Sequence, residues 1–429
     1  MELELTEVPK ETREEFESYP NVTGTGIGPK QRAGQPDEET ESVIVFVTKK
    51  VSEADLGEDE IIPSEIEIDG KTYETDVQES GEVRALELEL TAPEAPMNLE
   101  QRGRAEIQEI PESLSRTRRW RPAPAGVSCG HPDITAGTLG TQPLRTQDDR
   151  LVFLTNSHVA ANSGQANRGD TVLQPGPYDG GSAPDDAIGS LLSFNAIDAS
   201  TSAPYPENKT DSALVEVKPD HLQTDIWELH EDLREFTDAQ IGAVHVKSGR
   251  TTGVTRAKCT ARHASFNVQY SHGVAKMVDL DVFNAMAAGG DSGSLIGMEQ
   301  EDGFYGTSLL FAGSSSITLG VPMDTVQAEH GRLTPVSSQD LVDADDMRVT
   351  GTAFRVSLDP SQVIHRWSGP WDDRYAVDFV GHPVNSGDWV DVRVASTYRT
   401  ASGIYYQIRA ENKWSSRSAD CDVNYSVTR

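Results

Sequence analysis

Gly289-Gly290-Asp291-Ser292-Gly293-Ser294 is the stretch around which this chain is organised. Glycines on both sides of Ser292 allow a strained turn in which the backbone N–H groups of Gly290 and Ser292 point together. Attack on an acyl carbon needs an activated hydroxyl and two such donors beside the oxygen that gains charge. The apolar run Leu295-Ile296-Gly297 predicts a buried strand behind the turn. Ser292 is therefore the candidate nucleophile, with Gly290 and Ser292 as the candidate oxyanion hole.

A Gly-Asp-Ser-Gly motif is common in loops, so its interpretation depends on a base and an acid elsewhere. Among the ten histidines, His158 has the most suitable setting, because it follows a predicted strand, Leu151–Thr155, and has small neighbours. Small neighbours let an imidazole stand at the rim of a cleft. The alternative is a histidine that caps a strand inside the core. We take His158 as the candidate general base.

The third member of such a site is a buried carboxylate that holds the imidazole tautomer. Asp211 fits, because it precedes the strand-like run Ala213–Val217. Asp186, in a loop rich in glycine and acid before Ala187-Ile188-Gly189, is the runner-up.

His158, Asp211 and Ser292 follow one another in the order that resembles chymotrypsin-fold serine peptidases, and this order differs from those of subtilisins and α/β-hydrolases. The motifs around the three residues match that family residue by residue. A narrower group of microbial trypsin-like peptidases, to which a plant leaf-shape regulator of the same fold is similar, shares further motifs. These are Ala136–Gly140, Gln174–Gly181, Lys247–Gly253 and Leu310–Ser314.

The resemblance implies a mainly β fold in which residues 116–330 form a double antiparallel β-barrel of chymotrypsin type. His158 and Asp211 would lie on the first six-stranded barrel and Ser292 on the second. Short apolar runs bounded by Gly, Asp and Ser agree with barrels. Residues 220–237 are the exception and predict a helix between the barrels.

In this fold the first substrate pocket is walled by the segment before the serine and by a later strand. The resemblance places Met286 and Ala287 on one wall and Gly313 and Ser314 on the other. A pocket for Lys or Arg needs a carboxylate at its floor, but Met286 stands where that acid would be. We expect a preference for small or medium apolar residues, unless a loop shift brings Asp281 into the pocket.

Residues 1–115 predict a small α+β domain ahead of the barrels. The expected elements are a short acidic helix at 11–19, strands at 22–28 and 42–48, and a hairpin from 61 to 77. This order, with its Gly-x-Gly-x-Gly run, resembles the leader domain of the same microbial group. It would be either a permanent packing domain or a pro-segment that occludes the cleft.

The remaining segments are linkers and a third domain. Residues 92–124 and 331–346 have linker composition, and the first of these carries a dense basic run, Arg116, Arg118, Arg119 and Arg121. That run is interpreted as a solvated linker that pairs with the acidic surface, with a processing site for another protease as the alternative. Residues 347–429 alternate strongly and are rich in aromatic residues, which predicts a small β-sandwich. Its aromatic residues would form a core or bind carbohydrate or peptide.

At 429 residues the chain allows two or three domains, and its formal net charge is −32. Such acidity argues against nucleic-acid binding, which needs clusters of Lys and Arg. Acid spread through the first three hundred residues predicts a protein of a halophilic cytoplasm, and an ordinary acidic protein is the alternative.

No apolar run is long enough for a transmembrane helix, and the first residues do not read as a secretory signal. Cys129, Cys259 and Cys421 form no metal motif, so no metal and no cofactor are expected. Cys129 and Cys259 would lie close in the implied fold, but reduced thiols are the simpler expectation.

These observations predict a serine endopeptidase that hydrolyses polypeptides through an acyl-enzyme on Ser292. The alternative is a catalytically silent scaffold that binds protein or carbohydrate through its C-terminal domain.

Overall fold

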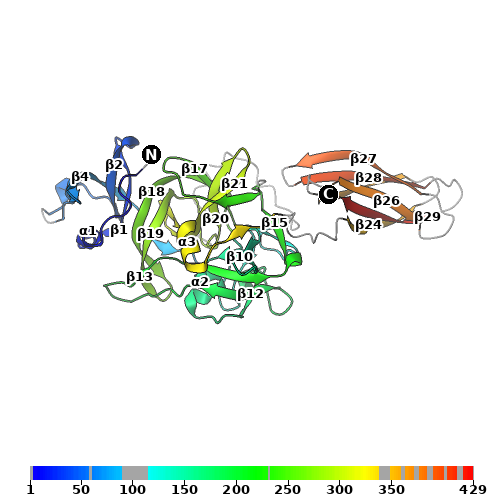
Figure 1. Ribbon diagram of the computed structural model, residues 1–429, viewed down its shortest axis with the longest axis horizontal. Coiled ribbons are helices and arrows are strands. Elements are labelled where there is room, and N and C mark those ends of the chain that lie inside the picture. The colour runs from blue at the N-terminus through cyan, green and yellow to red at the C-terminus, as the bar shows by residue number, and fades with distance from the viewer. Residues whose placement is uncertain are drawn as a thin grey trace. The chain divides into compact units, whose positions relative to one another are not determined.

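The computed structural model describes residues 3–57, 60–88, 115–229 and 232–337, and beyond these the backbone of 348–358, 363–371, 376–383, 390–400, 403–412 and 419–428. The chain forms two compact units, Met1–Ser337 and Ser338–Arg429. Both are built mainly from strands (Figure 1), as the sequence predicts. Whether residues 1–115 fold by themselves stays a prediction.

A six-stranded sheet in the first unit carries His158. Its central strand is β10 (Leu151–Thr155), whose residues are apolar or Thr and are all buried, as expected for a strand with a neighbour on each side. The short helix α2 (Ser157–Ala160) follows it directly. The strand order is β11 (Thr171–Leu173), β12 (Ala187–Phe194), β14 (Ala213–Val217), β10 (Leu151–Thr155), β9 (Leu144–Arg145) and β23 (Thr334–Pro335).

A second set of six strands forms a closed ring, because β18 pairs with both β17 and β19. Closure leaves no free edge within the ring. The turn that carries Ser292 joins two of these strands, and α3 (Met323–His330) follows the last one. In ring order the strands are β17 (Val244–Gly249), β18 (Gly253–Tyr270), β19 (Gly273–Asn284), β22 (Ile317–Pro322), β21 (Gly303–Gly313) and β20 (Leu295–Gln300).

The helix expected at 220–237 is wrong. The segment holds a single 3-10 turn, Pro219–His221, and two strands, β15 (Leu222–Ile226) and β16 (Leu233–Phe236). In β15 alternate residues are buried, which is the period of a strand. β15 pairs with β6 (Ala123–Ala125) and β16 pairs with β21, so contacts distant in sequence decide the conformation.

The N-terminal strands extend the sheet of the closed ring, since β1 pairs antiparallel with β18 (Figure 1). The Gly-x-Gly-x-Gly run allows this contact: a Cβ on Gly28 would lie 2.6 Å from the carbonyl oxygen of Thr260. The helix covers the sheet through buried Phe16. The elements are α1 (Lys10–Glu17), β1 (Val22–Arg32), β2 (Gln35–Val47), the 3-10 turn Glu53–Asp55, β3 (Glu65–Ile68), β4 (Lys71–Glu79) and β5 (Arg84–Ala85).

Arg116 and Arg121 of the basic run are packed rather than solvated, whereas the pairing of Arg116 and Arg119 with acidic residues agrees with the linker interpretation. Arg116 donates to the Gly126 carbonyl oxygen at 2.9 Å and pairs with Glu228 at 2.8 Å. Arg121 donates to the carbonyl oxygens of Asp186 and Ala187, both at 3.0 Å. The guanidinium groups therefore satisfy backbone carbonyls that burial would otherwise leave unpaired. Residues 92–114 and 338–346 of the predicted linkers lie outside the described residues.

The remaining strands of the first unit are short: β7 (Ser128–Cys129), β8 (Gly137–Thr138) and β13 (Glu207–Asn208). The 3-10 turns Asn162–Gly164 and Pro177–Asp179 lie in its loops.

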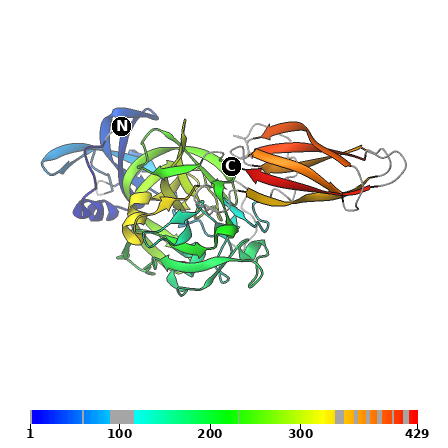
Figure 2. The ribbon, with the colours of Figure 1, turned by 45° about the vertical axis from the view of Figure 1, so that its right-hand side comes forward.

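The described residues of the second unit form two three-stranded antiparallel sheets, drawn in orange and red in Figure 2. Two such sheets agree with the β-sandwich expected for residues 347–429. One has the order β24 (Arg348–Leu358), β29 (Ala419–Thr428), β26 (Ala376–Pro383), and the other β25 (Val363–Trp371), β28 (Gly403–Asn412), β27 (Val390–Thr400).

Candidate active site

His158 and Asp211 meet at the end of two neighbouring strands. β10 pairs with β14, and Thr155 lies opposite Ala213, so the residues just beyond these positions converge. His158 Nδ1 lies 2.6 Å from Asp211 Oδ2, and the His158 N–H donates to Asp211 Oδ1 at 3.1 Å. Both side chains are buried. The carboxylate thus holds the imidazole by two contacts and leaves Nε2 facing away from it.

Tyr270 is a third group at this carboxylate, and sequence reasoning missed it. Its hydroxyl donates to Asp211 Oδ2 at 3.1 Å from the end of β18. Burial, and then the charge of Asp211, raise the pKa of Tyr270 well above its usual value, so the hydroxyl keeps its proton. No local pattern marks Tyr270, because its role comes from a contact across the two sheets.

The surroundings of His158 raise the pKa of its imidazole. Burial alone would lower the pKa of His158, but the charge of Asp211, its hydrogen bond and the charge of Glu87 outweigh burial and raise the pKa. A base with a raised pKa takes a proton from a hydroxyl more readily, although it must be neutral beforehand.

The turn at Ser292 has the left-handed backbone that its glycines predict. Gly290 has φ +91° and Gly293 has φ +95°, values that L residues rarely adopt. A Cβ on Gly290 would lie 2.6 Å from Thr251 Oγ1, so a side chain there would also collide. The backbone conformation therefore favours glycine at both positions, and at Gly290 the lack of room for a side chain requires it as well.

A buried ion pair holds the same turn from below. Asp291 Oδ2 lies 3.2 Å from Lys247 Nζ, and neither side chain is exposed. Burial would raise the pKa of Asp291, but Lys247, the hydroxyl and N–H of Thr252 and the N–H of Ala288 lower it below its ordinary value. The carboxylate therefore stays charged, and the Thr251 N–H binds it as a fifth group at 2.8 Å. A lysine beside valine in the strand Val244–Gly249 was the available sequence signal for this pair.

One short segment connects the serine turn to the histidine strand. Thr138 donates its N–H to the Ser292 carbonyl oxygen at 2.8 Å and its hydroxyl to the Gly290 carbonyl oxygen at 2.9 Å. Its own carbonyl oxygen accepts from Thr155 Oγ1 at 2.8 Å, at the end of β10. Thr138 thereby fixes the two halves of the site against each other.

A backbone carbonyl already lies against the serine. The Gly290 N–H donates to the Leu86 carbonyl oxygen at 2.9 Å. The Ser292 hydroxyl lies 3.0 Å from that oxygen and 3.2 Å from the Phe311 carbonyl oxygen, and its single proton serves one of them at a time. His158 Nε2 is buried without a hydrogen-bond partner among the described residues. In this arrangement the hydroxyl is bonded to a carbonyl rather than to His158.

The two predicted oxyanion donors differ. The Gly290 N–H donates to the Leu86 carbonyl oxygen, whereas no hydrogen bond from the Ser292 N–H is found in the described part of the chain.

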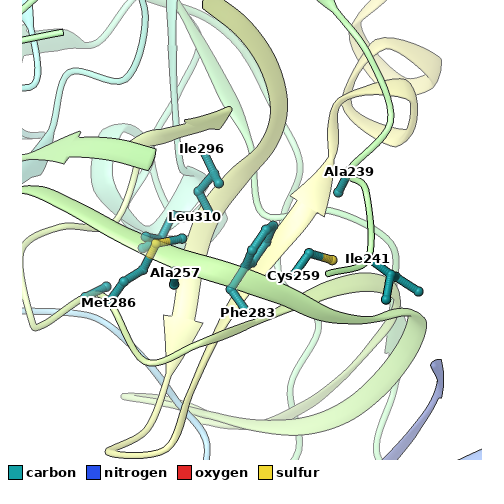
Figure 3. Packing of buried hydrophobic residues seen from close by; sticks show 9 residues of the cluster. Ala239, Ile241, Ala257, Cys259, Phe283, Met286, Ile296 and Leu310 are labelled. Carbon is teal, nitrogen blue, oxygen red and sulfur yellow. The ribbon is translucent and has the colours of Figure 1, made fainter. Parts of the chain in front are cut away.

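The predicted pocket residues lie around the Leu86 side chain. Met286 and Ala287 belong to a buried apolar cluster with Leu310 and Phe283, shown in Figure 3, and Leu86 packs against this cluster. A Cβ on Gly313 would lie 3.6 Å from Leu86 Cδ1. Ser314 instead donates its hydroxyl to the Ser80 carbonyl oxygen, so it holds the approaching segment rather than the pocket.

The alternative acids have other partners. Asp186 Oδ1 pairs with Arg119 at 3.1 Å, while its Oδ2 accepts from the Ser182 N–H at 2.9 Å. Asp281 accepts from Ser308 Oγ at 2.7 Å and pairs with Arg262 at 3.1 Å. Burial raises the pKa of Asp281 to about 6 despite the opposing effect of Arg262.

The sequence also makes predictions about metal-binding clusters, membrane-spanning helices and the cysteines. Within the described residues, no cluster of His, Cys, Asp and Glu could hold a metal ion, and no helix is long and apolar enough to cross a membrane. Cys129 and Cys259 are buried and free, so they do not pair. Burial raises the pKa of both thiols and keeps them protonated.

No family model and no curated protein matches this chain. Among solved structures, it is similar to Thermobifida fusca protease A at TM-score 0.36 and 17% identity, covering 50% of this chain and 98% of that chain. The Nocardiopsis protease is similar at TM-score 0.35 and 16% identity, covering 50% and 98%. Cellulomonas bogoriensis chymotrypsin is similar at TM-score 0.33 and 16% identity, covering 50% and 99%. TM-scores and sequence identities this low support no conclusion about function. The fold described above follows from the strand order of this chain alone.

Proposed function

We propose that this protein is a serine endopeptidase with His158, Asp211 and Ser292 as its catalytic residues. The observation that carries the proposal is the buried imidazole of His158, bound at Nδ1 by Asp211 at 2.6 Å, while Nε2 has no hydrogen-bond partner among the residues that the structure describes. Burying a ring nitrogen without a partner costs free energy, and a catalytic role that requires it to take up a proton explains why this cost is retained. The serine turn, held by Thr138 against the same strand, supplies the hydroxyl.

In the proposed mechanism, Ser292 attacks a peptide carbonyl and His158 takes the hydroxyl proton. Asp211 keeps the imidazole in the tautomer that exposes Nε2 and stabilises the imidazolium. The Gly290 and Ser292 N–H groups hold the oxyanion. His158 then protonates the leaving amine, and water hydrolyses the ester on Ser292.

The pocket beside the serine supports an apolar residue at the cleavage position. Met286 and Ala287 form one wall and Gly313 lies on the other, while Asp281 is engaged by Arg262 and Ser308. A buried substrate cation would lack a partner in such a pocket. Discrimination among apolar residues is graded, at ~1–3 kcal/mol per methylene.

A catalytically silent scaffold is the second candidate, and the aromatic C-terminal residues are its only support. Peptide hydrolysis separates the two candidate functions. It is measured in a Leu86→Asp background, because a charged side chain is expected to leave the apolar cluster and so to free the cleft that Leu86 occupies. In that background Ser292→Ala or His158→Ala is expected to lower kcat by ~10³-fold or more with the melting temperature unchanged. Fluorophosphonate labelling, lost in Ser292→Ala, is the parallel readout. Equal hydrolysis rates with and without Ser292 would exclude the proposed role.

A further inference from the structure

The segment that ends in Leu86 lies in the candidate active site as an added strand. β5 pairs antiparallel with β21, with Ala85 opposite Ala312 and Arg84 opposite Gly313. The Leu86 N–H donates to the Phe311 carbonyl oxygen at 3.0 Å, which continues this ladder to the serine. Recognition by strand addition places every second side chain in a pocket and fixes the register by backbone hydrogen bonds.

Contacts on the other side fix the segment further. The Gln269 N–H donates to the Val83 carbonyl oxygen at 3.0 Å, and Gln269 also pairs with Arg84. β5 therefore lies between two strands of the ring, β18 and β21. This register brings one carbonyl, that of Leu86, to both the Gly290 N–H and the Ser292 hydroxyl.

Side chains agree with that register. Leu86 packs on the apolar cluster that contains Met286. The chain continues past Gly289, where a Cβ would lie 2.9 Å from the Glu87 carbonyl oxygen, so only a glycine leaves room for the next residue. Glu87 also acts on His158, because its charge contributes to the raised pKa of that residue. The Leu86 carbonyl therefore lies at the serine, and the Glu87 side that would leave is near enough to His158 for its charge to act there.

We propose that Ser292 cleaves the Leu86–Glu87 bond of its own chain, an inference that rests on the proposed peptidase function. Ser292 Oγ forms a bond to the Leu86 carbonyl carbon while His158 Nε2 takes the hydroxyl proton. The carbonyl oxygen becomes the oxyanion beside the Gly290 N–H. The C–N bond then breaks, and His158 protonates the Glu87 nitrogen, which becomes a new amino terminus.

Water completes the reaction. It attacks the Leu86 ester on Ser292 and gives one proton to His158, which returns it to the Ser292 oxygen as the ester bond breaks. Leu86 is left with a carboxylate. The reaction is intramolecular because β1 pairs with β18 and holds the leader beside the cleft. Positioning of this kind corresponds to effective molarities of ~10⁵–10⁸ M. The same pairing keeps the two fragments together after cleavage.

The test uses the full-length wild type, Ser292→Ala, Leu86→Asp and Glu82→Gln, followed after purification by denaturing electrophoresis, N-terminal sequencing and intact mass. The wild type is expected to yield a fragment that begins at Glu87 and a partner that ends at Leu86. Both fragments should elute together on size exclusion. Ser292→Ala should stay whole, and so should Leu86→Asp, which puts an unpaired charge against the apolar cluster.

Glu82→Gln is the matched control, because Glu82 is exposed and pairs only with Arg84 among the described residues. It should be cut like the wild type. Leu86→Met, which keeps an apolar side chain, should also be cut and shows that loss in Leu86→Asp is not misfolding. The fraction cut per hour should not change across a hundredfold dilution, as expected for cleavage within one chain.

Two results overturn the proposal and are distinguishable. If the wild type stays whole while the Leu86→Asp protein is labelled at Ser292 and hydrolyses peptides, the peptidase proposal stands and self-cleavage is wrong. If the wild type stays whole and Ser292 is also unreactive in Leu86→Asp, both proposals fail. Cleavage of Ser292→Ala at the same bond would assign the cut to a contaminating protease.

Discussion

At the scale of single residues, the candidate site depends on how Asp211 is shared. It binds His158 by two contacts and accepts from Tyr270, and all three side chains are buried. A carboxylate with fixed partners on both oxygens can hold only one orientation of the imidazole. The orientation and the pKa of the His158 imidazole are therefore set by its bonded and charged neighbours rather than by solvent.

Asp211→Asn should lower the plateau of kcat/KM by ~10⁴-fold, because an amide at this position favours the wrong imidazole tautomer. The pH profile should move as well. In the native protein the acid limb should lie above the ordinary histidine value of ~6.5, since the pKa of His158 is raised and the base must be neutral. Without the charge of Asp211, the burial effect dominates and the limb should shift to lower pH. Initial rates from pH 5 to 9 in the Leu86→Asp background measure both effects.

Asp186→Asn is the matched control, because Asp186 pairs with Arg119 and contacts neither His158 nor Ser292 among the described residues. Its plateau and its acid limb should equal those of the parent. A larger loss in Asp186→Asn than in Asp211→Asn would mean that the acid is wrongly assigned.

At the scale of elements, the Lys247–Asp291 pair joins strand β17 to the serine turn. Lys247→Met keeps the length of the side chain but leaves the Asp291 carboxylate buried without its cation. Such a loss costs ~3–5 kcal/mol of the free energy of unfolding. Because Asp291 also binds the Thr251 and Thr252 N–H groups, the turn should loosen and peptide hydrolysis should fall with stability.

Urea unfolding and kcat measure this prediction, with Arg256→Met as the comparison. Arg256 pairs with Glu299 at 2.8 Å, but both side chains are substantially exposed, so that pair is worth ~1 kcal/mol or less. If the two substitutions had equal effects on stability, the buried pair would not hold the turn.

At the scale of the whole molecule, charge is the dominant property. A formal net charge of −32 over 429 residues makes self-repulsion large when screening is weak, and the Debye length is ~10 Å at 0.1 M ionic strength. We propose that the chain is adapted to high salt, so its melting temperature should rise steeply between 0.1 and 2 M KCl, as followed by circular dichroism.

Repeating the KCl series near the isoelectric point separates the screening of negative charges from a general effect of salt on hydrophobic burial. Near the isoelectric point of about 4.6 the net charge vanishes, so the rise with KCl should be much smaller there. A melting temperature that stays flat or falls with KCl at neutral pH would contradict the halophilic interpretation.

The sequence by itself determined the parts of this protein that depend on neighbours along the chain. Glycine positions predicted the strained turn at Ser292, which is left-handed in the structure, and a run of four apolar residues before Thr155 predicted β10 ahead of His158. Alternation predicted the strands of the second unit. These features are local, because a periodic pattern of apolar residues or a glycine restricts the backbone wherever the chain goes.

Tertiary structure decided what depends on residues far apart in sequence. The segment 220–237 became strands because β15 and β16 found partners, and the Arg116 run became packed because buried carbonyls accept its donors. Leu86 lies at Ser292 only because β5 enters between β18 and β21. No local pattern encodes such a contact, since its free energy comes from surfaces and hydrogen-bonding groups that meet only in the folded chain.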